Sequence, residues 1–303
     1  MNWVGFKTLT FREVGRFFSV WRQTIIPGLI SSILYILIFG FTLEKRIDNI
    51  DGIPYTLFIL PGLIMMNALS NATSNSSSSM LQMKLLGQLP DILQAPLSSF
   101  EISMAYIIGG MVRGTINGIL IMIVGILVGG MTVANPFQTI AFIFIVSWAF
   151  SSIGLLLGQL SESWDQLATM QNFVLTPLSF LGGIFYSIKM LPEWAQTLSM
   201  FNPIYYMING LRYTILGISD SDPLHSFLIA TLTVLALSKA DIPVVTPLPF
   251  KSTDTVNAVS IGSELLVTIF PSCKCSQRSS VNGAHINPLP YVAIKLISSG
   301  VIF

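Results

Sequence analysis

Long apolar stretches separated by short polar segments run through most of this 303-residue chain. A helix needs about 20 mostly apolar residues to cross the core of a bilayer. Five stretches meet that length with few charged residues, and a sixth, shorter one follows. We therefore predict an all-α polytopic membrane protein with six transmembrane helices, at residues 23–43, 53–72, 104–130, 137–160, 167–188 and 223–238.

The composition agrees with this pattern. Hydrophobic residues make up 52% of the chain and charged residues only 10%, whereas soluble domains carry about 25% charged residues. The net charge of +1 gives no reason to expect a nucleic-acid partner. Both cysteines, Cys273 and Cys275, lie near the end of the chain, so no disulfide framework holds its main body.

Basic residues precede the first predicted span. This segment contains four basic residues, Lys7, Arg12, Arg16 and Arg22, and a single acidic residue, Glu13. Lysine and arginine accumulate on the cytoplasmic side of membrane proteins. We therefore expect a cytoplasmic N-terminus, and six spans would return the chain to the same side.

Residues 1–22 form an amphipathic pattern. On a helix, aromatic and apolar side chains gather on one side, namely Trp3, Phe6, Phe11, Val14, Phe17, Phe18 and Trp21. Arg12 and Arg16 fall on the opposite side. We expect a helix in the membrane interface, with its rings at headgroup depth and its arginines toward water. A helix packed against a soluble partner is the alternative.

The loop at residues 80–102 predicts a short helix between turns. Gly87, Pro90 and Pro96 mark the turns. The apolar side chains there are Leu86, Leu89, Ile92 and Leu93, next to Lys84 and Asp91. Such a helix on the inner face suits docking into a groove of another protein, although a re-entrant or purely structural connector would have the same pattern.

A polar track at residues 67–80 follows the second predicted span. Its serine and threonine residues more often bond helices together than line a pathway. We therefore assign only Asn67 and Asn71 to a substrate pathway.

The third predicted span contains Arg113 and recurring glycines. Arg113 could meet an anionic substrate group or Glu101, but we favour a side chain that reaches back to the cytoplasmic interface. The glycines between residues 109 and 129 predict close helix packing.

Several catalytic patterns are absent from the sequence. It has no G-x-x-x-x-G-K-[ST] phosphate loop, and His225 and His285 lack neighbouring ligands at zinc spacing. No acidic residue falls within the predicted spans to couple transport to protons or sodium. We expect no enzyme activity, metal or cofactor of the chain's own, so active transport would draw its energy from another subunit.

Specific motifs resemble the permease subunits of type-2 ABC exporters, in particular the YadH-like inner-membrane permeases of bacteria. They are "TLTFREVGRF" near the start, "LPDILQAPLSSFEI" in the inner loop and "LTPLSFLGGIFYSIKMLPEWAQTLSMFNPIYYMINGLR" at residues 175–212. The last is the most specific, because hydrophobic composition alone does not produce it. The resemblance covers about residues 1–238.

This resemblance implies a working unit of two permeases and two separate nucleotide-binding ATPases, which hold ATP and magnesium. The segment Leu86–Ala95 falls on the coupling helix that docks on the ATPase. Leu191–Tyr206 falls on short helices that re-enter the outer leaflet between spans five and six. The implied location is the bacterial inner membrane, and the implied substrate is an amphipathic drug, lipid or glycolipid. A stand-alone channel or ion-coupled carrier is the alternative function.

Three groups of site residues follow. The expected coupling residues are Leu86, Leu89, Pro90, Asp91, Ile92, Leu93, Ala95 and Pro96. The expected pathway residues are Asn67, Asn71, Phe180 and Tyr186. The expected outer gate consists of Trp194, Phe201, Asn202, Pro203, Tyr205, Tyr206 and Arg212, with Arg212 bound to headgroups or to an acidic group.

The segment 239–303 departs from the family pattern. It is rich in proline and contains no long apolar run. Only about 16 uncharged residues precede it in the sixth predicted span, about 24 Å of helix against a core of about 30 Å. We hypothesise that the reading frame is lost near residue 238, and a genuine cytoplasmic extension is the alternative.

Overall fold

The computed structural model describes residues 2–39, 52–218 and 223–244, which are almost entirely helical. The helices are α1 (Trp3–Ser19), α2 (Trp21–Ile38), α3 (Tyr55–Leu85), α4 (Leu89–Gln94), α5 (Ser99–Gly129), α6 (Pro136–Leu160), α7 (Trp164–Met170), α8 (Thr176–Leu181), α9 (Glu193–Met200), α10 (Pro203–Leu216) and α11 (Pro223–Val244). A π-helical turn, η2 (Gln171–Leu175), joins α7 to α8, and a 3₁₀ turn, η3 (Ile188–Met190), precedes α9. The prediction of an all-α protein is confirmed. Both cysteines, His285 and residues 245–303 of the atypical segment lie outside the described residues.

Four helices of the described part are long and apolar enough to cross a membrane: α2, α3, α5 and α6. They fall on the first four predicted spans, although residues 40–43 lie outside the described residues. The main difference is in α3, which continues far beyond residue 72, through the polar track, to Leu85. Its 31 residues correspond to about 46 Å of helix.

The last two predicted spans differ from simple membrane helices. Residues 167–188 do not form one helix, because α7, η2 and α8 follow one another from Trp164 and end at Leu181. Helix α11 spans 22 residues, Pro223–Val244, and so continues past residue 238. The count of six spans therefore stays a prediction.

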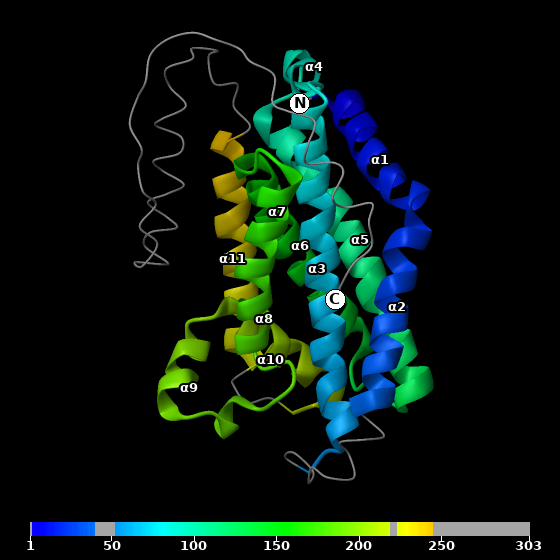
Figure 1. Cartoon of the computed structure of the whole chain (residues 1–303), viewed down its shortest axis with the longest axis vertical. Helices are drawn as coiled ribbons and strands as arrows, with labels where there is room; N and C mark the ends of the chain where they lie inside the picture. Colours follow the sequence, from blue (N-terminus) through cyan, green and yellow to red (C-terminus); the bar gives the residue numbers. More distant parts are fainter. Residues whose placement is uncertain (1, 40–51, 219–222, 245–303) are drawn as a thin grey trace, which may run out of the picture. The chain divides into compact units, whose positions relative to one another are not determined.

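Helix α3 packs against both α5 and α6, and small residues set the close approach (Figure 1). A Cβ atom added to Gly114 would meet Ala72 and Ala68 of α3, and one added to Gly118 would meet Ile143 of α6. The prediction of close packing at these glycines is confirmed.

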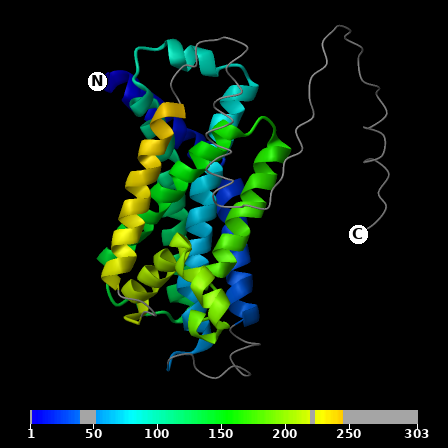
Figure 2. The same cartoon turned by 90° about the vertical axis from the view of Figure 1, so that its left-hand side faces the viewer.

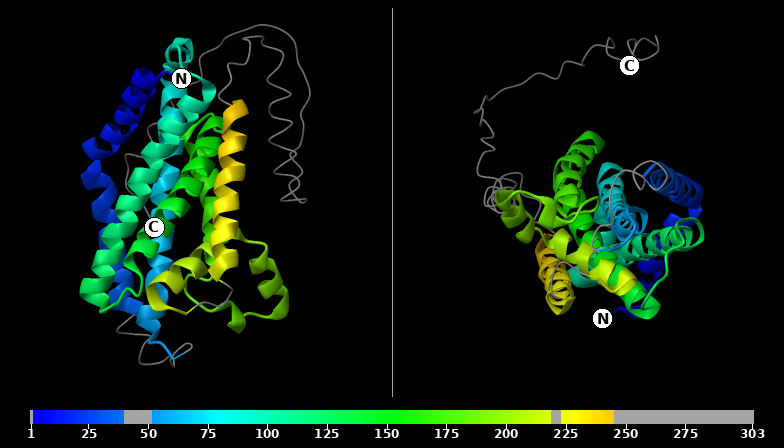
Figure 3. Two further views of the ribbon diagram at one scale, coloured as in Figure 1. Left: turned by 180° about the vertical axis from the view of Figure 1, so that it is seen from behind. Right: turned by 90° about the horizontal axis from the view of Figure 1, so that it is seen from below.

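The ends of the helices fall into two groups. Helix α4 and the start of α1 lie at the upper end in Figure 1, and α9 and α10 lie at the lower end. Figure 2 shows the same division from the side. Helix α10 runs across the lower end and packs against α3, α6 and α11 (Figure 3, right).

The N-terminal helix α1 differs in part from the predicted amphipathic pattern. Trp3, Phe11 and Phe18 are exposed, as expected of a membrane-facing stripe. However, Phe17 is fully buried, and Arg16 contacts α3 instead of pointing to water. The reason is that α1 packs along α5 and places one flank of its polar side on the bundle.

Candidate functional site

The connector around α4 is exposed at its outer surface and anchored by its apolar side. Leu86 is 60% exposed, and Pro90, Asp91 and Pro96 are also exposed. Ile92 is only 9% exposed and packs with Leu9, Met80 and other buried residues, while Leu89, Leu93 and Ala95 are half-buried. The apolar side of the predicted coupling helix therefore holds α4 on its own chain. The exposed residues are those that a partner could contact.

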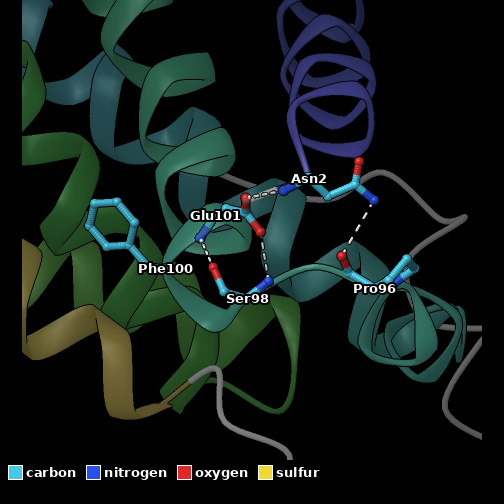
Figure 4. Close-up of a pocket in the computed structure, with 5 residues that line it drawn as sticks. All are labelled: Asn2, Pro96, Ser98, Phe100 and Glu101. Atoms are coloured by element: carbon cyan, nitrogen blue, oxygen red, sulfur yellow. Dashed lines mark hydrogen bonds between the residues drawn. The ribbon is translucent and has the colours of Figure 1, made fainter.

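The first turn of α1 is tied to this connector (Figure 4). The backbone N–H of Asn2 donates a 2.8 Å hydrogen bond to a carboxylate oxygen of Glu101, and its side-chain amide donates to the carbonyl of Pro96. Glu101 also caps α5 by accepting from the backbone N–H of Ser98, whose hydroxyl accepts from the N–H of Glu101. Together with Phe100, these residues line a shallow pocket. A displacement of α4 would therefore reach α1 and α5 at once.

The end of α3 is fixed to the end of α6 on the same side of the bundle. The Lys84 ammonium donates hydrogen bonds of 2.6 and 2.7 Å to the carbonyl oxygens of Gln159 and Ser161. These carbonyls belong to the last turn of α6 and its cap, which have no partner within their own helix. Lys84 thus joins the base of the α4 connector to α6.

A buried carboxylate joins α1, α3 and α5. Glu13 is 1% exposed and forms an ion pair with Arg12 at 2.8 Å. It accepts a hydrogen bond from Ser79 of α3, and Arg12 also donates to the hydroxyl of Tyr106 in α5. In the sequence, Glu13 is the single acidic residue among the basic residues of this segment, and this isolation is the only signal of its role.

Two further arginines meet at the amide of Asn75. Arg16 donates to the backbone carbonyl of Asn75 at 2.8 Å and to its side-chain oxygen at 3.4 Å. Arg113 reaches the same side-chain oxygen at 3.5 Å and donates two hydrogen bonds of 3.2 Å to Asn71. Burial lowers the pKa of Arg16 and the Glu13 carboxylate opposes that shift, so the guanidinium stays charged at neutral pH. Arg113 does not pair with Glu101, which is bound to Asn2 and Ser98.

The serine and threonine side chains of the polar track bond helices together. The hydroxyls of Ser76 and Ser151 lie 2.6 Å apart between α3 and α6, and Ser151 also donates to the carbonyl of Ile107 in α5. Thr73 donates to the carbonyl of Phe150. These contacts agree with the interpretation that this track holds the helices together.

The predicted pathway residues lie in two places along α2. Asn67 donates to the hydroxyl of Ser32 on α2, and Asn71 is engaged by Arg113. Phe180 instead stacks on Phe185 at 5.8 Å, in an aromatic cluster with Tyr35 of α2 and its C-cap residue Phe39.

The remaining pathway residue, Tyr186, donates its hydroxyl to the carbonyl of Phe180. The structure thus brings Phe180 and Tyr186 together, apart from the two asparagines. Ser32 and Tyr35 are one turn apart, so α2 borders both groups.

A glycine pair lets the chain turn sharply after α8. Gly183 has φ = 77°, a left-handed conformation that favours glycine. A Cβ atom on Gly62 of α3 would meet the backbone of Ile184, so the turn lies directly on α3. Within the "LGG" motif, Gly183 supplies the left-handed turn, and a Cβ atom on Gly182 would meet Ile204 and Ile208 of α10.

Arg212 and Asn202 bind this turn and the helix before it. The Arg212 guanidinium donates to the carbonyl of Gly183 at 3.0 Å and lies 3.9 Å from the ring centre of Phe58. The Asn202 amide donates to the carbonyl of Leu178 at 2.6 Å. Arg212 is only 3% exposed. This burial argues against the expected contact with headgroups, and the partners of Arg212 named within the described residues are a backbone carbonyl and an aromatic face.

The other predicted gate residues divide by exposure. Trp194 and Phe201 are strongly exposed, the latter at 84%, on and just after α9. Tyr205 is buried and Tyr206 half-buried, and their rings meet edge to face at 4.9 Å, while the half-buried Pro203 begins α10. Helix α9 therefore presents aromatic side chains outward, and α10 is part of the packed core.

Comparison with known proteins identifies the family. The model of the ABC-2 type transporter family matches residues 4–216. This chain belongs to that family.

Its relatives include the inner membrane transport permease YadH of Escherichia coli K12, which is 37% identical over 242 residues, covering 78% of this chain and 92% of the relative. Nodulation protein J of Rhizobium leguminosarum bv. viciae is 26% identical over 208 residues, covering 67% of this chain and 80% of the relative. The predicted resemblance is confirmed. The protein is a transport permease and a multi-pass inner-membrane protein.

Proposed function

We propose that this permease is the membrane subunit of an ATP-driven exporter. A separate ATPase chain, which binds ATP and magnesium, docks on α4 and supplies the energy. The N-terminus lies in the cytoplasm with α4, and two copies of the permease work together in the bilayer. The observation that carries this proposal is the construction of α4, a short helix exposed at one end of the bundle and anchored there by the buried side chain of Ile92.

The contacts of α4 suit the transmission of movement. Ile92 packs into a buried cluster with residues of α1, α3, α5 and α6, so a load on α4 is borne by four helices. The hydrogen bond between Asn2 and Glu101 adds a direct connection to the start of α1. In this proposal, ATP-driven movement of the partner tilts α1 and α5 together.

An amphipathic substrate suits the surface beside α2. The half-buried Asn67 lies next to it, bonded to the buried Ser32 of α2, and the aromatic rings of Tyr35 and Phe180 follow toward the opposite end. Such a surface offers hydrogen bonds to a polar head and flat apolar contacts to a ring or chain. Helices α9 and α10 act as the re-entrant cap at the outer end in this proposal.

Docking can be tested by purification with the ATPase encoded next to this gene. Leu86→Asp puts a charge on the exposed surface of the α4 connector and is expected to release the ATPase from the purified permease and to abolish transport. Leu198→Asp is the matched control, because Leu198 is a similarly exposed leucine on α9 at the other end. Retention of the ATPase by the Leu86→Asp variant contradicts the coupling assignment. Transport by the permease without any ATPase favours the stand-alone channel or carrier.

A further inference from the structure

We propose that Arg16 and Arg113, with the amides of Asn71 and Asn75, bind the phosphate group of an anionic lipid. The lipid belongs to the leaflet at the end of the bundle where α4 lies. This proposal does not depend on docking of an ATPase at α4.

The cluster carries more positive than negative charge. Three guanidinium groups, those of Arg12, Arg16 and Arg113, lie in this region with one carboxylate, Glu13. Glu13 pairs closely with Arg12 at 2.8 Å, whereas its nearest distance to Arg16 is 3.7 Å. Arg113 forms no ion pair within residues 2–39, 52–218 and 223–244. An excess of positive charge therefore remains at Arg16 and Arg113.

The cluster has more hydrogen-bond donors than acceptors. Arg16 and Arg113 both donate to the side-chain oxygen of Asn75, so a neutral amide separates two cations. The side-chain nitrogen of Asn75 and Nε of Arg16 are buried and, in the described part of the chain, have no hydrogen-bond partner. A site with surplus donors and surplus positive charge favours an oxyanion, and guanidinium groups pair especially well with phosphate.

The position of the cluster along α3 and α5 sets its depth in the membrane. Arg113 is 16 residues before the end of α5 at Gly129, or about 24 Å along the helix. Asn71 and Asn75 lie 16 and 20 residues after the start of α3 at Tyr55, or about 24 and 30 Å. Both helix ends lie opposite the α4 end. With a hydrocarbon core of about 30 Å, the cluster falls at the boundary where lipid phosphates lie.

The cluster is also accessible from the bilayer. The Arg16 side chain is 30% exposed, and Arg113 is half-buried. A bilayer phospholipid can therefore place its phosphate on the guanidiniums, with its chains directed along α5 toward the bilayer centre.

The test measures lipid bound to the full chain by native mass spectrometry, after equilibration with vesicles of phosphatidylcholine and phosphatidylglycerol. Wild type should retain phosphatidylglycerol preferentially. Arg113→Gln and Arg16→Gln should each bind it about tenfold less, the effect of losing one charge-assisted contact. Arg22→Gln is the matched control, because Arg22 is an exposed arginine outside the cluster and should leave binding unchanged.

Asn71→Asp keeps the test decisive if an arginine variant does not fold. The new carboxylate would accept the same hydrogen bonds from Arg113 and neutralise it within the chain. This variant should fold and lose the preference for phosphatidylglycerol. Unchanged binding in Asn71→Asp, or an equal loss in Arg22→Gln, overturns the proposal.

The source of the phosphate is distinguished by competition. Inorganic phosphate should displace phosphatidylglycerol only weakly, because a lipid also makes acyl-chain contacts. Displacement by millimolar inorganic phosphate would assign the site to a free anion and overturn the lipid proposal. Unidirectional transport of phosphatidylglycerol that stops with Arg113→Gln would assign the phosphate to a transported substrate, which also contradicts a resident bilayer lipid.

Discussion

Asn2 and Glu101 are 99 positions apart in the sequence, yet the backbone N–H of Asn2 donates a 2.8 Å hydrogen bond to the Glu101 carboxylate. This bond fixes the start of α1 to the start of α5, beside the connector that carries α4. The same carboxylate closes the capping box of α5 with Ser98.

Removing the cap should destabilise the α4 end in two steps. Ser98→Ala removes one capping hydrogen bond and should lower the free energy of unfolding by about 1 kcal/mol. Glu101→Ala should lower the melting temperature more than Ser98→Ala, because it also frees Asn2. Thermal unfolding in detergent measures both. Glu162→Ala, an exposed glutamate at the same end, should behave as wild type; equal melting temperatures for all three variants would refute the linkage.

Gly114 should tolerate no side chain. In Gly114→Ala the new methyl group would lie 2.7 Å from the Cβ of Ala72 and 2.8 Å from the carbonyl oxygen of Ala68. Overpacking of this kind costs about 1–3 kcal/mol, and we expect a lower melting temperature. Gly15→Ala is the control, because nothing lies within 4 Å of that position and α1 should gain about 0.5–1 kcal/mol. A stable Gly114→Ala variant would contradict the close approach of α3 and α5.

Arg212→Lys should destabilise the lower end of the bundle despite keeping the charge. Lysine cannot reproduce both the hydrogen bond to Gly183 and the flat contact with Phe58. We expect a loss of about 1–3 kcal/mol in unfolding free energy, since Arg212 is buried. Arg22→Lys provides the comparison, because Arg22 lies over the ring of Trp21 but is exposed. Similarly small losses of unfolding free energy in both variants would contradict a stabilising role of the Arg212 contacts.

Substitutions in the proposed outer gate should affect the transport rate and the melting temperature separately. Phe201→Ala should change the transport rate without changing the melting temperature, because Phe201 is exposed. Tyr205→Ala should change both, because Tyr205 is buried in α10. Transport in proteoliposomes, measured beside thermal unfolding, separates the two effects. Wild-type transport in both variants would reject the gate.

The sequence predicted the helices more reliably than their surroundings. Length and hydropathy located α2, α3, α5 and α6, because these properties depend on the chain alone. They did not reveal that α3 runs on to Leu85, since the polar track looks unsuited to lipid until Ser76 and Thr73 are placed against α5 and α6. Burial by neighbouring helices is a tertiary effect that no hydropathy window contains.

The candidate site shows the same division. Motif resemblance located the α4 connector, but the turn at Gly182–Gly183 fell within the fifth predicted span, and the partners of individual side chains depended on the fold. A helical wheel placed Arg16 toward water, whereas its guanidinium meets Asn75, 59 positions away. Arg212 was expected at headgroups or at an acidic group, whereas its guanidinium lies in the fold against the carbonyl of Gly183 and the ring of Phe58.

The π-helical turn at Gln171–Leu175 has a consequence for the rotational phase of the helix that contains it. A π turn holds one residue more than an α-helical turn, and each residue turns an α-helix by about 100°. Helix α8 is therefore rotated by about that angle relative to a continuous α-helix that begins at Trp164. Without this offset the carbonyl of Leu178, which accepts from Asn202, would be displaced by about 100° around the helix axis. One extra residue in η2 thus sets the direction in which every side chain from Thr176 to Leu181 faces.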